Sequence, residues 1–168
     1  MSVLGIDPGM QGGLALRGRG FVLVEPMPVN DQGLDLVAIY RWLKTHADEI
    51  EHAVIEQQSV RPKQDPFSGF KAGQGFGALV AFLVAIGIPY RIVLPQEWSD
   101  LFPHGVTEKR DLKLRYRQIK QVRKRIAGEL FPTVDLRESE RSRTAHEGMT
   151  DALLIAEYGY RSRMRGIS

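Results

Sequence analysis

The chain has 168 residues, a length that fits one globular domain (residues 1–168) with a sizeable core. It contains no cysteine, which excludes disulfides, thiolate metal sites and cysteine nucleophiles and leaves oxygen and imidazole groups as the available metal ligands. No apolar run reaches the roughly 18 to 20 residues of a membrane-spanning helix, and no basic segment before an apolar core marks the N-terminus. We therefore expect a soluble, cytoplasmic protein without a membrane partner.

Strands and turns alternate in the predicted N-terminal third. Arg17-Gly18-Arg19-Gly20 has the composition of a hairpin turn. Apolar residues at helical spacing after Gly33 predict a helix over 34–43. The predicted strands are 2–6, 13–17, 20–25 and 52–55.

Helices dominate the predicted remainder. Residues 59–66 are polar and punctuated by proline, which predicts a loop. The elements expected after it are a long apolar helix over 67–86, a strand over 89–94, a short helix from Pro95, a basic helix over about 107–130 and a last helix over 147–161. Strands and helices together predict a single domain of the mixed α/β class.

Positive charge is concentrated in one segment. Residues 1–60 carry four Lys/Arg against eight Asp/Glu, a net charge of −4, so the whole-chain net charge of +3 leaves +7 on residues 61–168. Nine basic residues but only Glu108 and Asp111 lie within residues 107–125. Such a band attracts phosphate backbones, which favours a nucleic acid as partner. The alternative is a solvated helix face.

Acidic residues stand where apolar elements end or begin. Asp7 closes the first strand, Glu56 follows the strand over 52–55, and Glu147 and Asp151 lie one turn apart at the start of the last helix. Mg²⁺ prefers oxygen ligands and keeps several waters, so a few converging carboxylates suffice to hold it. Taken singly, each has an ordinary alternative: a turn residue, a strand-end charge, or an acid at the positive end of a helix.

Several motifs, in order along nearly the whole chain, resemble those of RuvC-type Holliday junction resolvases, most closely the versions of phages and prophages. The resemblance implies an RNase H-like fold with a mixed five-stranded sheet flanked by helices, a homodimer, and nicking of four-way DNA junctions that depends on Mg²⁺ or Mn²⁺. One departure is that many members space the two C-terminal acids three apart, whereas position 148 here is glycine. The matching segments are Gly5-Ile6-Asp7-Pro8-Gly9, Ile55-Glu56, Phe70, Gly73, Gly77, Gly87-Ile88-Pro89, Pro95-Gln96-Glu97-Trp98 and the run from His146 to Gly159.

These residues predict a crossover junction endodeoxyribonuclease that uses two metal ions per active site. We assign Asp7 as the ligand that bridges both metals, with Glu56 and Asp151 each completing one shell. Glu147 is the fourth acidic ligand or orients the water. His146 is its rival, because an imidazole beside Glu147 can ligate metal or transfer protons near neutral pH. An exposed histidine at a helix start is the ordinary alternative.

DNA recognition is predicted for other residues. Phe67 and Phe70 follow the loop after Glu56, and the resemblance suggests that one of them wedges against unstacked bases, where stacking is worth roughly 1–3 kcal/mol. The alternative is that both rings face the core. The DNA-binding candidates are Gln57, Phe67, Phe70, Lys109, Lys113, Arg117, Lys120 and Lys124.

Gly69, Gly73 and Gly77 form a stripe of small residues along the long apolar helix. Glycine in a helix interior costs about 1 kcal/mol relative to alanine, so close packing on the sheet or a dimer contact should compensate. The resemblance favours the dimer, because paired incisions need two sites related by a two-fold axis.

Two other functions stay open at this point. A nuclease of the same fold could act on other branched DNA or on RNA–DNA hybrids, which the acidic residues do not distinguish. A non-catalytic junction-binding protein is the second, although the presence of all four carboxylates argues against it. An actin-like nucleotide hydrolase also begins with a strand that ends in Asp, but it needs two such domains and this chain is too short.

Overall fold

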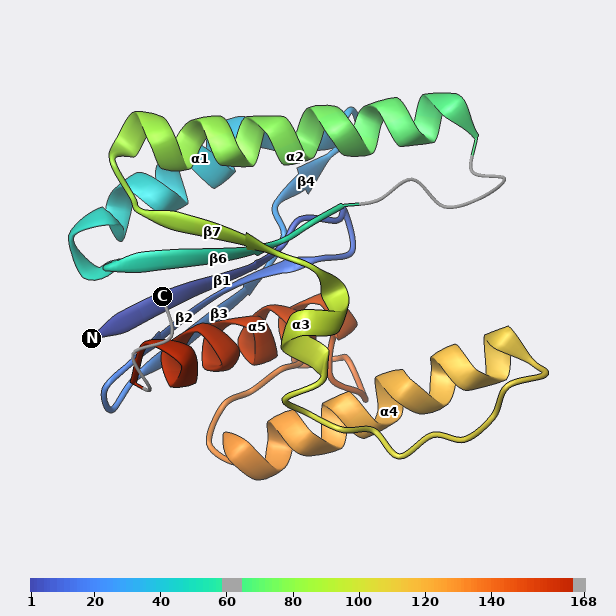
Figure 1. Cartoon of the computed structure of the whole chain (residues 1–168). Coiled ribbons are helices and arrows are strands. Elements are labelled where there is room, and N and C mark those ends of the chain that lie inside the picture. Colours follow the sequence, from blue (N-terminus) through green and yellow to red (C-terminus); the bar gives the residue numbers. More distant parts are fainter. Residues whose placement is uncertain (59–64, 165–168) are drawn as a thin grey trace.

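The computed structural model describes residues 1–58 and 65–164, and its centre is a five-stranded mixed sheet (Figure 1). The strands are β1 (Ser2–Asp7), β2 (Gly13–Gly18), β3 (Val22–Pro26), β6 (His52–Glu56) and β7 (Tyr90–Val93), and their order in the sheet is β3-β2-β1-β6-β7. The first three strands pair antiparallel, whereas β6 lies parallel to both β1 and β7. The predicted mixed five-stranded sheet is confirmed.

The predicted hairpin joins β2 to β3. Gly20 has φ of +87°, a conformation that glycine adopts without steric cost. The Gly18 N–H donates to the Phe21 carbonyl oxygen at 3.0 Å and closes the turn. The turn therefore forms where the glycine-rich sequence predicts it.

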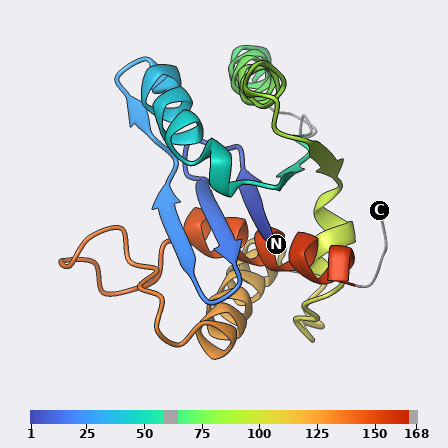
Figure 2. The same ribbon diagram turned by 90° about the vertical axis from the view of Figure 1, so that its left-hand side faces the viewer.

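Helices cover both faces of the sheet (Figure 2). One face carries α1 (Leu36–Thr45) and α2 (Pro66–Ile86), and the other carries α3 (Pro95–Ser99), α4 (Leu112–Leu130) and α5 (Glu147–Met164). Leu4, Ile6, Leu79 and Leu83 belong to the core on the first face, whereas Val3, Val54, Trp98 and the central residues of α5 belong to the core on the second.

Helix α5 lies very close to the sheet. A Cβ on Gly5 of β1 would lie 2.2 Å from the backbone oxygen of Ala152, so only glycine permits this approach. Most residues from Gly148 to Glu157 are buried completely or nearly so, including the polar Thr150 and Asp151. The helix that carries two candidate ligands, Glu147 and Asp151, is therefore largely part of the core.

Several details differ from the sequence prediction. A two-stranded sheet of β4 (Val29–Asn30) and β5 (Gly33–Leu34) and a 3₁₀ turn at Ala47–Glu49 were not predicted, because two- and three-residue elements have no readable periodicity. Helix α4 begins at Leu112, not near residue 107. Asp111 ends the preceding loop as N-cap, accepting hydrogen bonds from the N–H groups of Lys113 (2.9 Å) and Leu114 (3.0 Å).

Helix α2 is long and apolar enough to cross a membrane when length and composition alone are considered. This corrects the expectation that no stretch is long enough; the glycines and alanines of α2 keep its hydropathy high, and Lys71 is its single charged residue. Only 11% of its most apolar window is buried within the described residues. Several of its large apolar side chains, Phe67, Phe70 and Val84, are exposed.

Candidate active site

All four predicted acidic ligands line one cavity of about 860 Å³. Asp7 ends β1 and Glu56 ends β6, and the parallel register pairs their preceding residues, Ile6 and Ile55, so the two carboxylates leave the sheet at the same edge. Asp151 reaches the same cavity from the first turns of α5. The cavity thus joins segments that lie far apart in the sequence.

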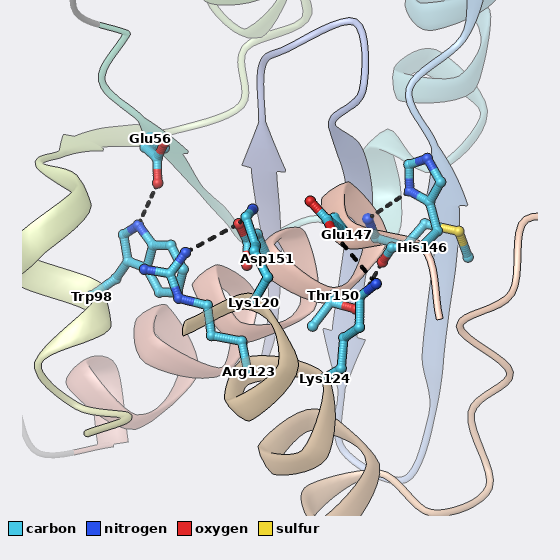
Figure 3. A network of polar contacts seen from close by, with 10 residues as sticks. Glu56, Trp98, Lys120, Arg123, Lys124, His146, Glu147, Thr150 and Asp151 are labelled. Carbon is cyan, nitrogen blue, oxygen red and sulfur yellow. Dashed lines mark hydrogen bonds and ion pairs between the residues drawn. The ribbon is translucent and has the colours of Figure 1, made fainter. Parts of the chain in front are cut away.

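Asp151 is the most buried of these acids, at 5% exposure. Its Oδ2 atom accepts hydrogen bonds from Lys120 Nζ at 2.5 Å and from Arg123 Nη1 at 3.2 Å, both from α4 (Figure 3). Its Oδ1 atom is buried and has no hydrogen-bond partner among the described residues. A buried carboxylate oxygen without a donor is costly unless another group satisfies it.

The site raises the pKa of two of these carboxyl groups, Asp7 and Glu56. Burial, and then the charges of Asp151 and Glu56, raise the pKa of Asp7 from 3.8 to about 7. Burial likewise raises the pKa of Glu56, an effect that the hydrogen bond from Trp98 opposes. Negative charge is therefore crowded here in a way that a nearby cation would relieve.

The donor set fits a hard divalent cation. Carboxylate oxygens are the ligands that Mg²⁺ and Mn²⁺ take, and the unpartnered Oδ1 of Asp151 is an oxygen available for one. Among the described residues, no three acidic or histidine side chains already stand together as a closed ligand set. Lys120 and Arg123 instead supply positive charge to Asp151.

The crowding predicts how stability depends on pH. Because the pKa of Asp7 is about 7 in the folded chain and 3.8 ordinarily, the folded protein holds this proton more tightly than the unfolded chain does. The contribution of Asp7 to the free energy of unfolding without metal should be largest below about pH 4, fall as pH rises through about 7 and then level off. Mg²⁺ should reduce this fall. Thermal unfolding at several pH values, in EDTA and in Mg²⁺, measures the fall in stability and its reduction by metal. If Tm changed with pH equally in EDTA and in Mg²⁺, the prediction would be wrong.

Glu147 and His146 lie nearer the solvent. Glu147 is the first residue of α5, its side chain is 46% exposed, and Lys124 Nζ lies 3.6 Å from its Oε1 atom. His146 acts as a helix cap: its Nδ1 atom accepts from the Met149 N–H at 3.2 Å, and its carbonyl oxygen accepts from the Thr150 N–H at 3.1 Å. Both residues line the cavity, but neither shares the buried cluster of Asp7, Glu56 and Asp151.

The unusual spacing of the C-terminal acids has a steric cause. Gly148, three residues before Asp151, packs against the turn between β1 and β2. A Cβ there would lie 2.1 Å from the Gln11 carbonyl oxygen and 2.4 Å from the Gly12 Cα atom. No side chain fits at position 148, so the acid stands one residue earlier, at Glu147.

Three residues that contact the carboxylates were not predicted to do so. The structure places Trp98 beside Glu56, and Lys120 and Arg123 beside Asp151. Lys120 and Lys124 were predicted to bind DNA, yet their ammonium groups lie against Asp151 and Glu147. For Trp98, the sequence signals are its place in the matching segment Pro95-Gln96-Glu97-Trp98 and in the short helix that directly follows strand β7.

The candidate aromatic wedges are both exposed. Phe67 and Phe70, in the first turns of α2, are each 63% exposed, so they do not face the core. The Gln57 N–H donates to the Val93 carbonyl oxygen at 2.8 Å, which fixes its backbone beside β7 and leaves its side chain exposed at the cavity. Most of the predicted loop, residues 59–64, lies outside the described residues.

Two glycines of the α2 stripe, Gly73 and Gly77, do not pack on the chain's own sheet. A Cβ on Gly73 or Gly77 would meet nothing within 4 Å, whereas one on Gly75 would meet Leu34 at 2.7 Å. The helix therefore uses Gly75 against the rest of the chain and leaves Gly73 and Gly77 open. Packing on the sheet is excluded as the reason for those two glycines.

No protein-family model matches this sequence, and no curated protein matches it either. The fold itself is the RNase H-like fold of Holliday junction resolvases. In particular, the chain is similar to Thermus thermophilus RuvC in complex with a Holliday junction substrate, with a TM-score of 0.64, 19% identity and coverage of 99% of this chain and 97% of that one.

Two further solved structures show the same likeness. A second Thermus thermophilus RuvC structure gives a TM-score of 0.61 at 19% identity, with coverage of 99% and 98% of the two chains. The yeast mitochondrial Holliday junction resolvase Ydc2 gives a TM-score of 0.55 at 16% identity, with coverage of 97% of this chain and 79% of that one. The predicted resemblance to RuvC-type proteins is thus confirmed at the level of the fold.

Proposed function

We propose that this chain is a metal-dependent endonuclease that resolves four-way DNA junctions. The observation that carries the proposal is the cluster of Asp7, Glu56 and Asp151 at one sheet edge, with a buried and unpartnered oxygen on Asp151. A fold shared with a RuvC bound to a Holliday junction supports the choice of substrate. A bacterial cytoplasm, with a phage as the source of the gene, is the setting we propose.

In this proposal Asp7, Glu56 and Asp151 would together hold two Mg²⁺ or Mn²⁺ ions, with Glu147 as a fourth ligand or an orienter of water. Such ions, when bound, would supply an activated water and neutralise charge on the attacking and leaving oxygens. Lys120 lines the same cavity as Asp151, so its ammonium group lies within reach of a phosphate that enters.

The DNA arms are proposed to contact the exposed side of α4 and the loop before it. Lys109, Lys113 and Arg117 are exposed, whereas Lys120 is only 12% exposed. Backbone contacts by such residues carry no sequence information and depend on salt. The exposed rings of Phe67 and Phe70 are proposed to stack on bases at the branch point, with Gln57 nearby.

Removing two of these charges tests the contact. The double variant Lys113→Gln with Arg117→Gln should weaken binding to junctions of every sequence alike and flatten the log–log salt dependence by about 0.9 for each lost phosphate contact. Arg41→Gln with Lys44→Gln, on exposed positions of α1, removes the same charge from the other face and should have little effect. Gel shifts over a salt series measure it, and equal slopes for both variants would make α4 a solvated helix.

The open stripe of α2 is proposed to contact a second copy of the chain. Gly69, Gly73 and Gly77 would let two helices approach closely, and Gly73 and Gly77 have free space above them. Two copies related by a two-fold axis would place two active sites on a symmetric junction.

Gly73→Leu should therefore yield a folded monomer that nicks junctions singly and loses paired incision. Gly128→Leu, at an open position of α4, is the matched control and should remain dimeric. Light scattering with circular dichroism separates dissociation from unfolding. A folded and fully dimeric Gly73→Leu variant would place the contact elsewhere.

Substrate choice needs one direct experiment. The purified protein is incubated with a synthetic four-way junction, a flap, an RNA–DNA hybrid and a plain duplex, with and without Mg²⁺ or Mn²⁺. We expect metal-dependent, symmetric nicks in the junction alone. Preferred cleavage of the flap or hybrid would indicate another nuclease of this fold, and tight junction binding without cleavage in either metal would indicate a non-catalytic binder.

A further inference from the structure

Trp98 contacts a candidate metal ligand although it lies 42 residues away in the sequence. It is completely buried in α3, and its indole Nε1–H donates to Glu56 Oε2 at 2.6 Å. A buried indole N–H normally finds an acceptor, and here that acceptor is charged when Glu56 is ionised. The bond fixes the orientation of the Glu56 carboxylate.

Arg123 joins the same indole to a second candidate ligand. Its guanidinium carbon lies 4.4 Å from the centroid of the Trp98 ring, and its Nη1 donates to Asp151 Oδ2 at 3.2 Å. Figure 3 shows the resulting chain from Glu56 through Trp98 and Arg123 to Asp151. Its members come from β6, α3, α4 and α5.

Each carboxylate is held by one oxygen and leaves the other without a donor. Trp98 holds Oε2 of Glu56, and no hydrogen bond to Oε1 occurs among the described residues. Arg123 and Lys120 hold Oδ2 of Asp151, and Oδ1 is buried without a partner. The two carboxylates are therefore oriented alike, with one oxygen tied back and one left for another ligand.

Neither charge nor core packing alone specifies this arrangement. A lysine at position 123 would supply the same positive charge, but it has no planar group to lie over the Trp98 ring while it donates to Asp151. A phenylalanine at position 98 would fill most of the same space without a donor, yet the residue there aims a donor at Glu56. The common element of these contacts is the direction they give to two carboxylates.

We propose that Trp98 and Arg123 are positioning residues, which orient Glu56 and Asp151 so that each offers a single oxygen to a divalent cation. The inference rests on the proposed function and names residues outside its ligand set. Groups that hold metal ligands in place typically change metal affinity or activity about 10–100-fold when they are lost. A planar guanidinium can lie flat over an indole ring and donate to a carboxylate at the same time, which the ammonium group of a lysine at position 123 does not reproduce.

Trp98→Phe tests the indole donor while it keeps an aromatic ring. We expect Mn²⁺ affinity, measured by calorimetry on the metal-free protein, to fall about 10-fold or more. Junction binding without metal and the circular dichroism spectrum should stay unchanged. For cleavage, kcat should fall while KM stays the same. Trp42→Phe is the matched control, because Trp42 is half-buried on α1 and packs against the core on the opposite face of the sheet from Trp98.

Arg123→Lys tests the stacked guanidinium at constant charge. It should also weaken Mn²⁺ binding, whereas Arg125→Lys, in an exposed ion pair on the same helix, should not. If Arg123 acted only through its charge, the lysine variant would bind Mn²⁺ as the wild type does. Should Trp98→Phe fail to fold, Arg123→Lys decides alone.

The outcomes separate the two proposals. Wild-type Mn²⁺ affinity in folded Trp98→Phe and Arg123→Lys variants would overturn the positioning role and leave the nuclease proposal standing. A wild-type protein that binds no Mn²⁺ and cuts no junction would overturn the nuclease proposal, and the positioning role with it. Weaker binding in both variants, with both controls unchanged, supports the inference.

Discussion

Asp7→Asn is expected to lower the rate of junction cleavage by at least about a thousandfold, while junction binding persists. The loss corresponds to about 4 kcal/mol in the activation barrier at 1.36 kcal/mol per tenfold. The amide keeps the shape of the side chain but removes the charge that the proposed bridging role requires. Asp48→Asn, at an exposed position, is the matched control.

The Asp7→Asn variant should lose activity but gain stability at high pH. Removing a carboxyl whose pKa is raised to about 7 by burial and by Asp151 and Glu56 relieves repulsion above that pH. The metal-free variant should therefore unfold at a higher temperature than the wild type at about pH 8. Retained cleavage would remove Asp7 from the site, and loss of binding in a folded variant would contradict the separation of catalytic from DNA-binding residues.

Gly148→Asp is expected to destabilise the protein by about 3 kcal/mol or more rather than to improve its active site. The substitution creates the three-residue acid spacing of many RuvC-type proteins, but its Cβ would overlap the backbone of Gln11 and Gly12. Overpacking typically costs 1–3 kcal/mol, and here backbone and not a flexible side chain must move. For a domain of this size, about 3 kcal/mol lowers Tm by roughly 6–12 °C.

Alanine gives the simplest form of the test. Gly148→Ala meets the same backbone atoms, whereas Gly128→Ala meets nothing within 4 Å on α4 and should be neutral or stabilising. Thermal unfolding followed by circular dichroism compares the two. Equal Tm values would show that the turn between β1 and β2 yields easily, and the steric account of the spacing would fail.

The strand-end acids could be predicted because their signal is local. Asp7 and Glu56 each follow a run of apolar residues, and parallel strands place their carboxyl ends at one edge. Asp151 was predicted because it opens an apolar helix. All three line one cavity, so simple patterns of strand and helix were sufficient to predict that these carboxylates lie close together.

The contacts that hold these acids could not be predicted, because they join elements far apart in the sequence. Arg123 is one of nine basic residues in its segment, and no local pattern distinguishes the one that stacks on Trp98 from those that face solvent. For the same reason, the ion pairs of Lys120 with Asp151 and of Lys124 with Glu147 could not be predicted. Which side of α4 faces α5 follows from packing, and α4 has a weak apolar stripe to indicate it.

The glycines illustrate the same limit. The sequence does not distinguish Gly73 from Gly148. A side chain at position 73 would enter open space, whereas any side chain at position 148 would clash with backbone atoms. Sequence spacing predicted a stripe on α2 but not which of its glycines the chain itself uses. Gly75, which lies off that stripe, is the one that faces Leu34.

Because α5 is buried, the segment that carries Asp151 and the exposed segment around Phe67 and Phe70 should move on different timescales. Amide protons along Ala152–Ala156 should exchange with solvent only when the whole domain unfolds, because that helix forms the core on one face of the sheet. Amides near Phe67 and Phe70, with exposed side chains around them, should exchange through small local openings. The part of the protein proposed to meet DNA can thus adapt to a branch point, while Asp151 keeps its place through every such adjustment.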